Sequence, residues 1–321
     1  MAVTKVLDQI WCIEVPLPKN PLKYLNAYFI RGKERNLLID TGFNLPACRE
    51  ALLSGLEELG VSMETTDIFL THMHSDHTGL VEAVKSRTST VWASEKDAEV
   101  IRVAGSDDFW GELEQLWIKL GFREDSHTHP GRKFAANGNF PMEILGEGDE
   151  VNVGDYRFQV LHTPGHTKGH LCLYEKDQKI LISGDTILAD ITPNISIGVG
   201  NLNPLGDYFE SLKRLESLRV EHTLTAHRRR PASLYERIRE LRDHHGHRLE
   251  EALGIVRSGR GMTAAEAASK MHWDITSRTW EEFPPSQKWF AIGEAAAHLQ
   301  LLAARGDIAR REEKGYWIYE G

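Results

Sequence analysis

The segment THMHSDHTGL (71–80) contains three histidines and one aspartate within six consecutive positions, as His72, His74, Asp76 and His77. Imidazole is the commonest metal ligand in proteins, and a carboxylate adds a hard oxygen ligand. The segment directly follows the apolar run DIFL, so a predicted strand presents these side chains at its end. One such histidine alone would be interpreted as a core or surface residue. Four candidate ligands this close together predict a metal site.

If segment 71–80 binds metal, further ligands must come from elsewhere in the chain. The turn HTPGHTKGH (162–170) places His166 after a predicted strand, and LISGDT (181–186) places Asp185 after another. A third run, HTLTAH, ends on His227. Each of these side chains stands at the end of a strand, where rigid scaffolds present functional groups. We therefore expect all three to converge with segment 71–80 on metal.

The elements that must position these side chains alternate along the first 230 residues. Apolar runs at 27–32 and 36–42 predict paired strands, and the spacing of 45–60 predicts a helix that ends near Gly60. Residues 90–101 predict a strand followed by a helix. Strands interrupted by helices along one chain are typical of an α/β architecture, with sheets covered by helices.

The pattern changes from about residue 231. A long charged helix is followed by a short helix with Thr263 as its N-cap, a helix that ends at Gly306, and two strands around a Lys-Gly turn. This is the element order of a winged helix-turn-helix module. We predict domains at 1–230 and 231–321, with 103–145 as an insertion of helix and loop in the first, because it has no clear strand pattern.

These residues resemble the metallo-β-lactamase superfamily over roughly 25–230. The matched motifs are the segment 72–77, then His166, Asp185 and His227, with LLIDTG (37–42) upstream. The resemblance implies an αββα sandwich of the α/β (α+β) class. It also implies three sets of metal ligands: one metal held by His72, His74 and His166, a second by Asp76, His77 and His227, and Asp185 bridging both. Asp40 in LLIDTG resembles a carboxylate that orients ligands, although a turn-forming aspartate is an equal alternative.

Two adjacent cations would lower the pKa of a bound water from about 15.7 towards about 7, which yields hydroxide for hydrolysis at neutral pH. We expect Asp76 to be catalytic, by orienting this hydroxide and passing a proton to the leaving group. Zinc is the expected metal for both positions. A set of histidines and carboxylates without thiolates would also accept iron or manganese. His127 and His129 are interpreted as exposed loop residues, with a place at the edge of the pocket as the alternative. The histidines of segment 243–247 are interpreted as having no metal role.

Three functions remain open at this stage. The hydrolase domain with a winged-helix-like C-terminus resembles the lactamase-β-like and glyoxalase II-like branch, which contains thioesterases and a single-strand endoribonuclease. A hydrolase of thioesters or related small esters is favoured, and a phosphodiesterase or ribonuclease acting on single-stranded nucleic acid is the alternative. A DNA-binding regulator is the third. The net charge of −9, and the 3 Lys and 10 Arg against 3 Asp and 11 Glu in 231–321, argue against a nucleic-acid partner.

Cysteine use and hydropathy set the expected location. Cys12, Cys48 and Cys172 are odd in number and widely spaced, which predicts a reducing compartment without disulfides. No apolar run approaches the roughly 18 residues of a membrane span, and the N-terminus does not have a signal-peptide pattern. We predict a soluble, cytoplasmic protein with a small-molecule substrate, linked to CoA or another thiol, and no membrane partner. Its C-terminal domain is expected to cover the site or to form a homodimer surface.

Overall fold

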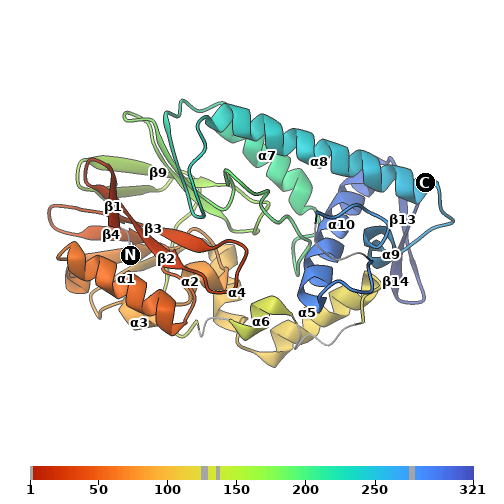
Figure 1. The fold of residues 1–321 in the computed structure, drawn as a ribbon, viewed down its shortest axis with the longest axis horizontal. Helices are drawn as coiled ribbons and strands as arrows, with labels where there is room; N and C mark the ends of the chain where they lie inside the picture. Colours follow the sequence, from red (N-terminus) through yellow and green to blue (C-terminus); the bar gives the residue numbers. More distant parts are fainter. Residues whose placement is uncertain (1–2, 124–128, 135–137, 275–278) are drawn as a thin grey trace. The chain divides into compact units, whose positions relative to one another are not determined.

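Two large β-sheets form the first part of the chain, and a separate two-stranded sheet lies near its C-terminus (Figure 1). The computed structural model describes residues 3–123, 129–134, 138–274 and 279–321. The first sheet follows chain order: β1 (Val3–Leu7), β2 (Ile10–Pro16), β3 (Tyr24–Ile30), β4 (Asn36–Ile39), β5 (Thr66–Phe69), β6 (Val91–Ala93) and β7 (Glu143–Ile144). The second has the order β12 (His222–Thr225), β11 (Ile180–Gly184), β10 (Leu171–Glu175), β9 (Tyr156–His162) and β8 (Glu150–Val153).

Strand direction decides where the ends of these strands lie. Strands β1 to β4 pair antiparallel, whereas β4 to β7 pair parallel, so the carboxyl ends of β4 and β5 meet at one edge. In the second sheet β11 and β12 are parallel, and β10 is antiparallel to both β9 and β11. The β9–β10 connection therefore lies at the same edge as the carboxyl ends of β11 and β12. Open α/β sheets commonly bind ligands beyond such ends.

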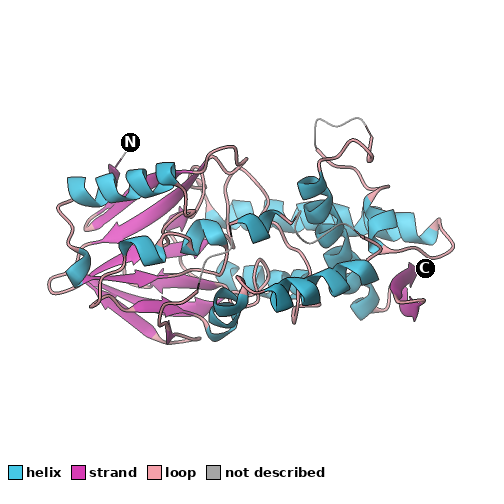
Figure 2. Cartoon of the chain, turned by 90° about the horizontal axis from the view of Figure 1, so that it is seen from below, coloured by secondary structure: helices cyan, strands magenta, loops and turns pink. Residues whose placement is uncertain are grey.

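The two sheets pack face to face around an apolar core. This core contains Tyr28, Ile30 and Phe69 from the first sheet and Phe158 and Leu173 from the second, all almost fully buried. A second core lies on the other face of the first sheet, which is covered by α1 (Pro46–Glu58), α3 (Val81–Val84) and α4 (Glu95–Val103). Figure 2 shows the strands of both sheets together, with helices outside them. The predicted α/β sandwich is confirmed.

The chain divides into two compact units that are interleaved in sequence. The first consists of Met1–Gly105, Phe134–Pro193 and Ser211–Arg237, and the second of Ser106–Lys133, Asn194–Glu210 and Ile238–Gly321. Helices α7 (Pro204–Glu216) and α8 (Leu234–Arg257) each pass from one unit to the other. No helix within the described residues is long and apolar enough to cross a membrane.

The second unit contains the C-terminal elements in the predicted order. These are the end of α8, then α9 (Ala264–Ala268), α10 (Pro285–Arg305) and the hairpin of β13 (Ala309–Glu313) and β14 (Tyr316–Glu320). Thr263 caps α9 in a full capping box, and Gly306 ends α10 with a left-handed φ of 79°. Lys314 and Gly315 both have positive φ, as a tight hairpin turn requires. These local predictions are confirmed.

Helices α5 (Asp107–Lys119) and α6 (Pro130–Lys133) belong to the same unit and lie within the predicted insertion 103–145. An aromatic cluster joins α5 to α10. The ring of Trp289 lies 4.5 Å from that of Trp117 and 4.9 Å from that of Phe122, between ring centroids. His129 packs edge-on against Trp289 at 4.8 Å, and its burial lowers its pKa to about 4. Trp289 is 1% exposed, whereas its neighbour Phe290 is 43% exposed.

The cluster predicts a large difference between two adjacent substitutions in α10. Trp289→Ala should lower the free energy of unfolding by about 3–5 kcal/mol, because it removes a buried ring and leaves a cavity. Phe290→Ala should change it by less than about 0.5 kcal/mol, because that ring is largely in solvent. Chemical denaturation of both variants measures the two values. Equal losses would contradict the packing described for this helix.

Candidate metal centre

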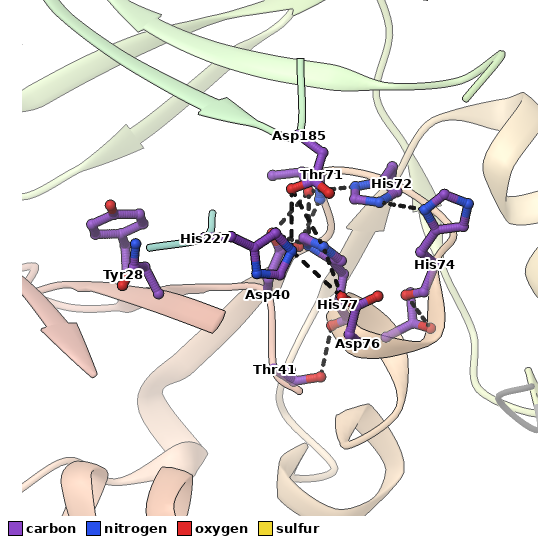
Figure 3. Close-up of polar contacts among 12 residues, drawn as sticks. Tyr28, Asp40, Thr41, Thr71, His72, His74, Asp76, His77, Asp185 and His227 are labelled. Carbon is purple, nitrogen blue, oxygen red and sulfur yellow. Dashed lines mark hydrogen bonds and ion pairs between the residues drawn. The ribbon is translucent and has the colours of Figure 1, made fainter. Parts of the chain in front are cut away.

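The seven predicted ligands lie together at the facing edges of the two sheets. Figure 3 labels all of them except His166. The first group consists of His72 and His74, which follow β5, and His166, in the β9–β10 connection. His74 Nδ1 lies 3.0 Å from His72 Nε2 and 2.9 Å from His166 Nε2. Three imidazole nitrogens from two separate loops therefore point at one centre.

The second group consists of Asp76, His77 and His227. Asp76 and His77 lie on the short helix α2 (Ser75–Thr78), and His227 follows β12. Asp76 Oδ2 lies 3.4 Å from His227 Nε2 and 3.9 Å from His77 Nε2. All three side chains are buried.

Asp185 lies between the two groups and faces both. Its Oδ2 is 3.5 Å from His166 Nε2, and its Oδ1 is 3.4 Å from His227 Nε2 and 3.7 Å from His77 Nε2. The backbone N–H of Asp185 donates to His170 Nε2 at 3.1 Å. Gly184, with φ of 48°, allows this approach, because a Cβ there would lie 2.6 Å from the same nitrogen.

Asp40 fixes the orientation of His77. It follows β4 in a left-handed conformation with φ of 60°, and its Oδ2 lies 2.8 Å from His77 Nδ1. The carboxylate also accepts from the N–H of Thr71 at 2.9 Å and from its hydroxyl at 2.8 Å. Because a carboxylate accepts hydrogen bonds, His77 carries a proton on Nδ1 and turns Nε2 towards the second group. Sequence reasoning assigned no role to Thr71, although it stands directly before the motif.

His227 is oriented by backbone groups of the first sheet. Its Nδ1 lies 3.0 Å from the carbonyl oxygen of Tyr24, which directs Nε2 to the site. The chain just before it is tied to β3, since Asn26 Nδ2 and Tyr28 Oη both donate to the carbonyl oxygen of Thr225. The N–H of Asn26 donates to Ala226 as well. The strand that carries His227 is thus joined to the opposite sheet at the site.

The donor atoms fit metal ions. His77 Nε2, His227 Nε2 and Asp185 Oδ1 are buried without a hydrogen-bond partner among the described residues. Such atoms are costly unless something else binds them. Ligands about 2.0–2.1 Å from a tetrahedral zinc ion lie about 3.4 Å apart, which is close to the separations given above. Histidine nitrogens and carboxylate oxygens also suit iron and manganese.

In the metal-free protein the histidines of the two ligand groups differ in protonation. Burial, and then the neighbouring histidines, hold the pKa of His72 and of His74 well below its usual value, so both rings are neutral. Burial would also lower the pKa of His77, but Asp40, Asp76 and Asp185 outweigh it and raise the pKa from 6.5 to about 10. Burial would raise the pKa of Asp185, yet His227 and His77 hold it well below its usual value.

The other histidines considered in the sequence lie outside this centre. His127 is outside the described residues, and His129 packs in the aromatic cluster of the second unit. His245 is fully buried in α8, where its Nδ1 lies 3.2 Å from His298 Nε2. None of the ligand groups within the described residues includes His129, His245 or His298.

Comparison with known families agrees with this geometry. The family model described as metallo-beta-lactamase superfamily matches residues 22–227, and a second, described as metallo-beta-lactamase-like C-terminal domain, matches 262–321. The chain belongs to the metallo-beta-lactamase superfamily. All seven candidate ligands and Asp40 lie within residues 22–227. The whole His/Asp cluster therefore lies in the part of the chain that matches the superfamily.

Relatives within the superfamily include thioesterases. The acyl-coenzyme A thioesterase MBLAC2 of Homo sapiens is 33% identical over 170 residues, or 50% of this chain and 58% of that protein. A hydroxyacylglutathione hydrolase of Rhodospirillum rubrum is 30% identical over 54% of this chain and 51% of its own length. Both matches span less than two thirds of the relative's length. The crystal structure of a metallo-beta-lactamase family protein from Thermus thermophilus has a TM-score of 0.82 at 29% identity, covering 98% of this chain and 99% of that one.

The raised pKa of His77 predicts how the stability of the metal-free protein depends on pH. The folded state binds this proton more tightly than the unfolded chain does. The stabilisation is therefore complete below pH 6.5 and is lost as pH rises to about 10. Chemical denaturation in the presence of a chelator should show this decline, and His77→Gln should flatten it. An equally steep decline in His77→Gln would contradict the assignment.

The contact between Asp40 and His77 predicts an effect on metal affinity. Asp40→Asn should weaken metal binding by about 10–100-fold, because the amide can no longer accept from both His77 and Thr71 as the carboxylate does. Titration against a chromophoric chelator measures the affinity. Asp8→Asn serves as a control at an aspartate whose side chain is 77% exposed. Unchanged affinity in Asp40→Asn would contradict the orienting role.

Proposed function

We propose that this protein is a hydrolase of thioesters that uses two divalent metal ions, with zinc as the first candidate and iron or manganese as alternatives. The observation that carries the proposal is the position of Asp185, which turns one carboxylate oxygen towards His166 and the other towards His77 and His227. A carboxylate with two such faces is suited to bridging two cations. The acyl-coenzyme A thioesterase and the hydroxyacylglutathione hydrolase among the relatives support the substrate class.

Each ligand has a proposed place in this centre. His72, His74 and His166 would hold one metal, and Asp76, His77 and His227 the other, with Asp185 shared. When bound, such cations supply Lewis acidity, which makes water acidic enough to attack near neutral pH and polarises a carbonyl oxygen. Neutral His72 and His74 already offer lone pairs, whereas His77 must give up its Nε2 proton.

Asp76 is the proposed proton carrier. It is 7% exposed, and its Oδ2 faces His227 Nε2 at 3.4 Å. In thioester hydrolysis the attacking water loses a proton and the departing thiolate sulfur gains one. A carboxylate at this position can accept the first proton and deliver it to the sulfur. Asp40 lies behind His77, where it keeps Nδ1 protonated and so prevents the ring from rotating.

The charge of the chain favours a small substrate over a polynucleotide. The formal net charge is −9, whereas binding to phosphate backbones depends on clustered Lys and Arg. A thioester of CoA or glutathione brings a carbonyl carbon with a good thiolate leaving group.

A cytoplasmic location and a homodimer remain predictions from the sequence.

Thiol release from a panel of acyl-CoA and acyl-glutathione thioesters tests the proposal. Metal-loaded protein should release thiol, a chelator should abolish the release, and added Zn²⁺ should restore it. Asp76→Ala should lower turnover by about 10²–10⁴-fold, the usual contribution of a general acid–base group. Asp8→Ala, which removes an exposed carboxylate, should leave it unchanged.

Two results would change the proposal. Unchanged turnover in Asp76→Ala would exclude the proton-carrying role. Absence of thiol release from protein that binds two equivalents of metal would exclude CoA and glutathione thioesters, and single-stranded RNA would then be the next substrate to test.

A further inference from the structure

A buried aspartate outside the ligand set lies at the start of α4. Asp97 is 2% exposed and is separated by 24 residues from Met73 and by 70 from Thr167. Its own N–H donates to Ser94 Oγ, the N-cap of the helix. A carboxylate in the first turn of a helix is favoured by the helix dipole, but burial still makes it costly without donors.

Asp97 receives its donors from the two loops that carry the first ligand group. Its Oδ2 accepts from the N–H of Met73 at 2.9 Å and from the hydroxyl of Thr167 at 2.7 Å. Its Oδ1 accepts from the N–H of Gly169 at 2.8 Å. One carboxylate thus binds the loop after β5 and the β9–β10 connection at the same time.

The contact depends on a close approach of backbone to helix. A Cβ at Gly169 would lie 2.1 Å from Ser94 Oγ and 2.5 Å from Asp97 Oδ1. Any larger residue there would push aside the Ser94 hydroxyl and the Asp97 carboxylate and so break the contact. Glycine at this position therefore lets the β9–β10 connection reach the carboxylate.

The bonded groups are next to the metal ligands in the chain. Met73 stands between His72 and His74, and Thr167 directly follows His166. The spacing between His74 Nδ1 and His166 Nε2 depends on how these two loops are held together. Their backbones are also joined where the N–H of Leu171 donates to the carbonyl oxygen of Thr71 at 2.8 Å, but that bond lies at the far end of the β9–β10 connection from His166.

We propose that Asp97 is a positioning residue for the first metal, which sets the separation of His72 and His74 from His166. The inference rests on the metal binding proposed above. Asp97 is then a buried aspartate that positions the first ligand group without being a ligand, as Asp40 positions His77 in the second group. Asp97 does not touch the ligand nitrogens in these contacts, so it acts through the backbone of their loops.

Asp97→Asn tests this role with little change in shape. An amide has one acceptor oxygen, so in either orientation its NH₂ group meets at least one of the three donors, and a loop must move. Asp67→Asn is the matched control, because Asp67 is also buried and accepts from Arg35 and from the N–H of Thr90. Asp67 lies on β5, and these two bonding partners belong to neither ligand loop.

Affinity for Co²⁺ and its visible absorption spectrum are the readouts, together with the thermal midpoint of each metal-free variant. We expect Asp97→Asn to bind Co²⁺ about 10–100-fold more weakly than the unmodified protein, with a changed spectrum. Asp67→Asn should lower the thermal midpoint yet keep the affinity and the spectrum. Thr167→Val, which removes one of the three donors, should shift the affinity in the same direction by less.

Each outcome is decisive. Unchanged Co²⁺ affinity in Asp97→Asn, or equal losses in both aspartate variants, would overturn the positioning role while leaving the proposed metal centre intact. If Asp97→Asn does not fold, unchanged affinity in Thr167→Val would overturn it. Failure of the unmodified protein to bind Co²⁺ or Zn²⁺ would instead refute the proposed function itself.

Discussion

The structure depends on the cost of bringing histidine nitrogens and carboxylate oxygens together in a buried place. Asp185 Oδ1, His77 Nε2 and His227 Nε2 have no hydrogen-bond partner in the described part of the chain, and none is open to water. An apolar core cannot satisfy such atoms, and only a bound cation or a redistribution of protons can. The surrounding sheets must therefore be held firmly enough to keep these atoms in place.

Several bonds at the facing edges of the sheets supply that firmness. The N–H of Asn26 donates to Ala226, and that of Leu171 to Thr71, so each sheet is bonded to the other beside the ligands. Asp40 adds a side-chain link between the ends of β4 and β5 through Thr71. Movement of one sheet along the other would break these bonds and separate the ligands, which makes the centre a rigid part of the first unit.

Much of the fold and the membership of the site are predictable from the sequence, because both leave local signals. The polar residues after apolar runs mark strand ends, and the capping box at Thr263 and the Lys-Gly turn mark the C-terminal elements. The orientation of Asp185 towards both ligand groups depends on long-range packing, and so does the orientation of His74, whose Nδ1 points at His72 and His166. The spacing of residues along the sequence does not predict such packing. Asp97 left no signal either, because it stands in an ordinary helix start after Ser94. Strand β7 has only two residues, too few for any periodicity.

The interleaving of the two units limits how the protein can be shortened. A chain that ended at Arg237 would keep every candidate ligand, yet it would also keep Ser106–Lys133 and Asn194–Glu210, which belong to the second unit. Trp117 and Tyr208 in those segments are buried in the intact protein. Without α10, the ring of Trp117 would lose its contact with Trp289 and become exposed. Such a fragment is expected to aggregate, so the candidate ligands and the C-terminal elements should be expressed together as one chain.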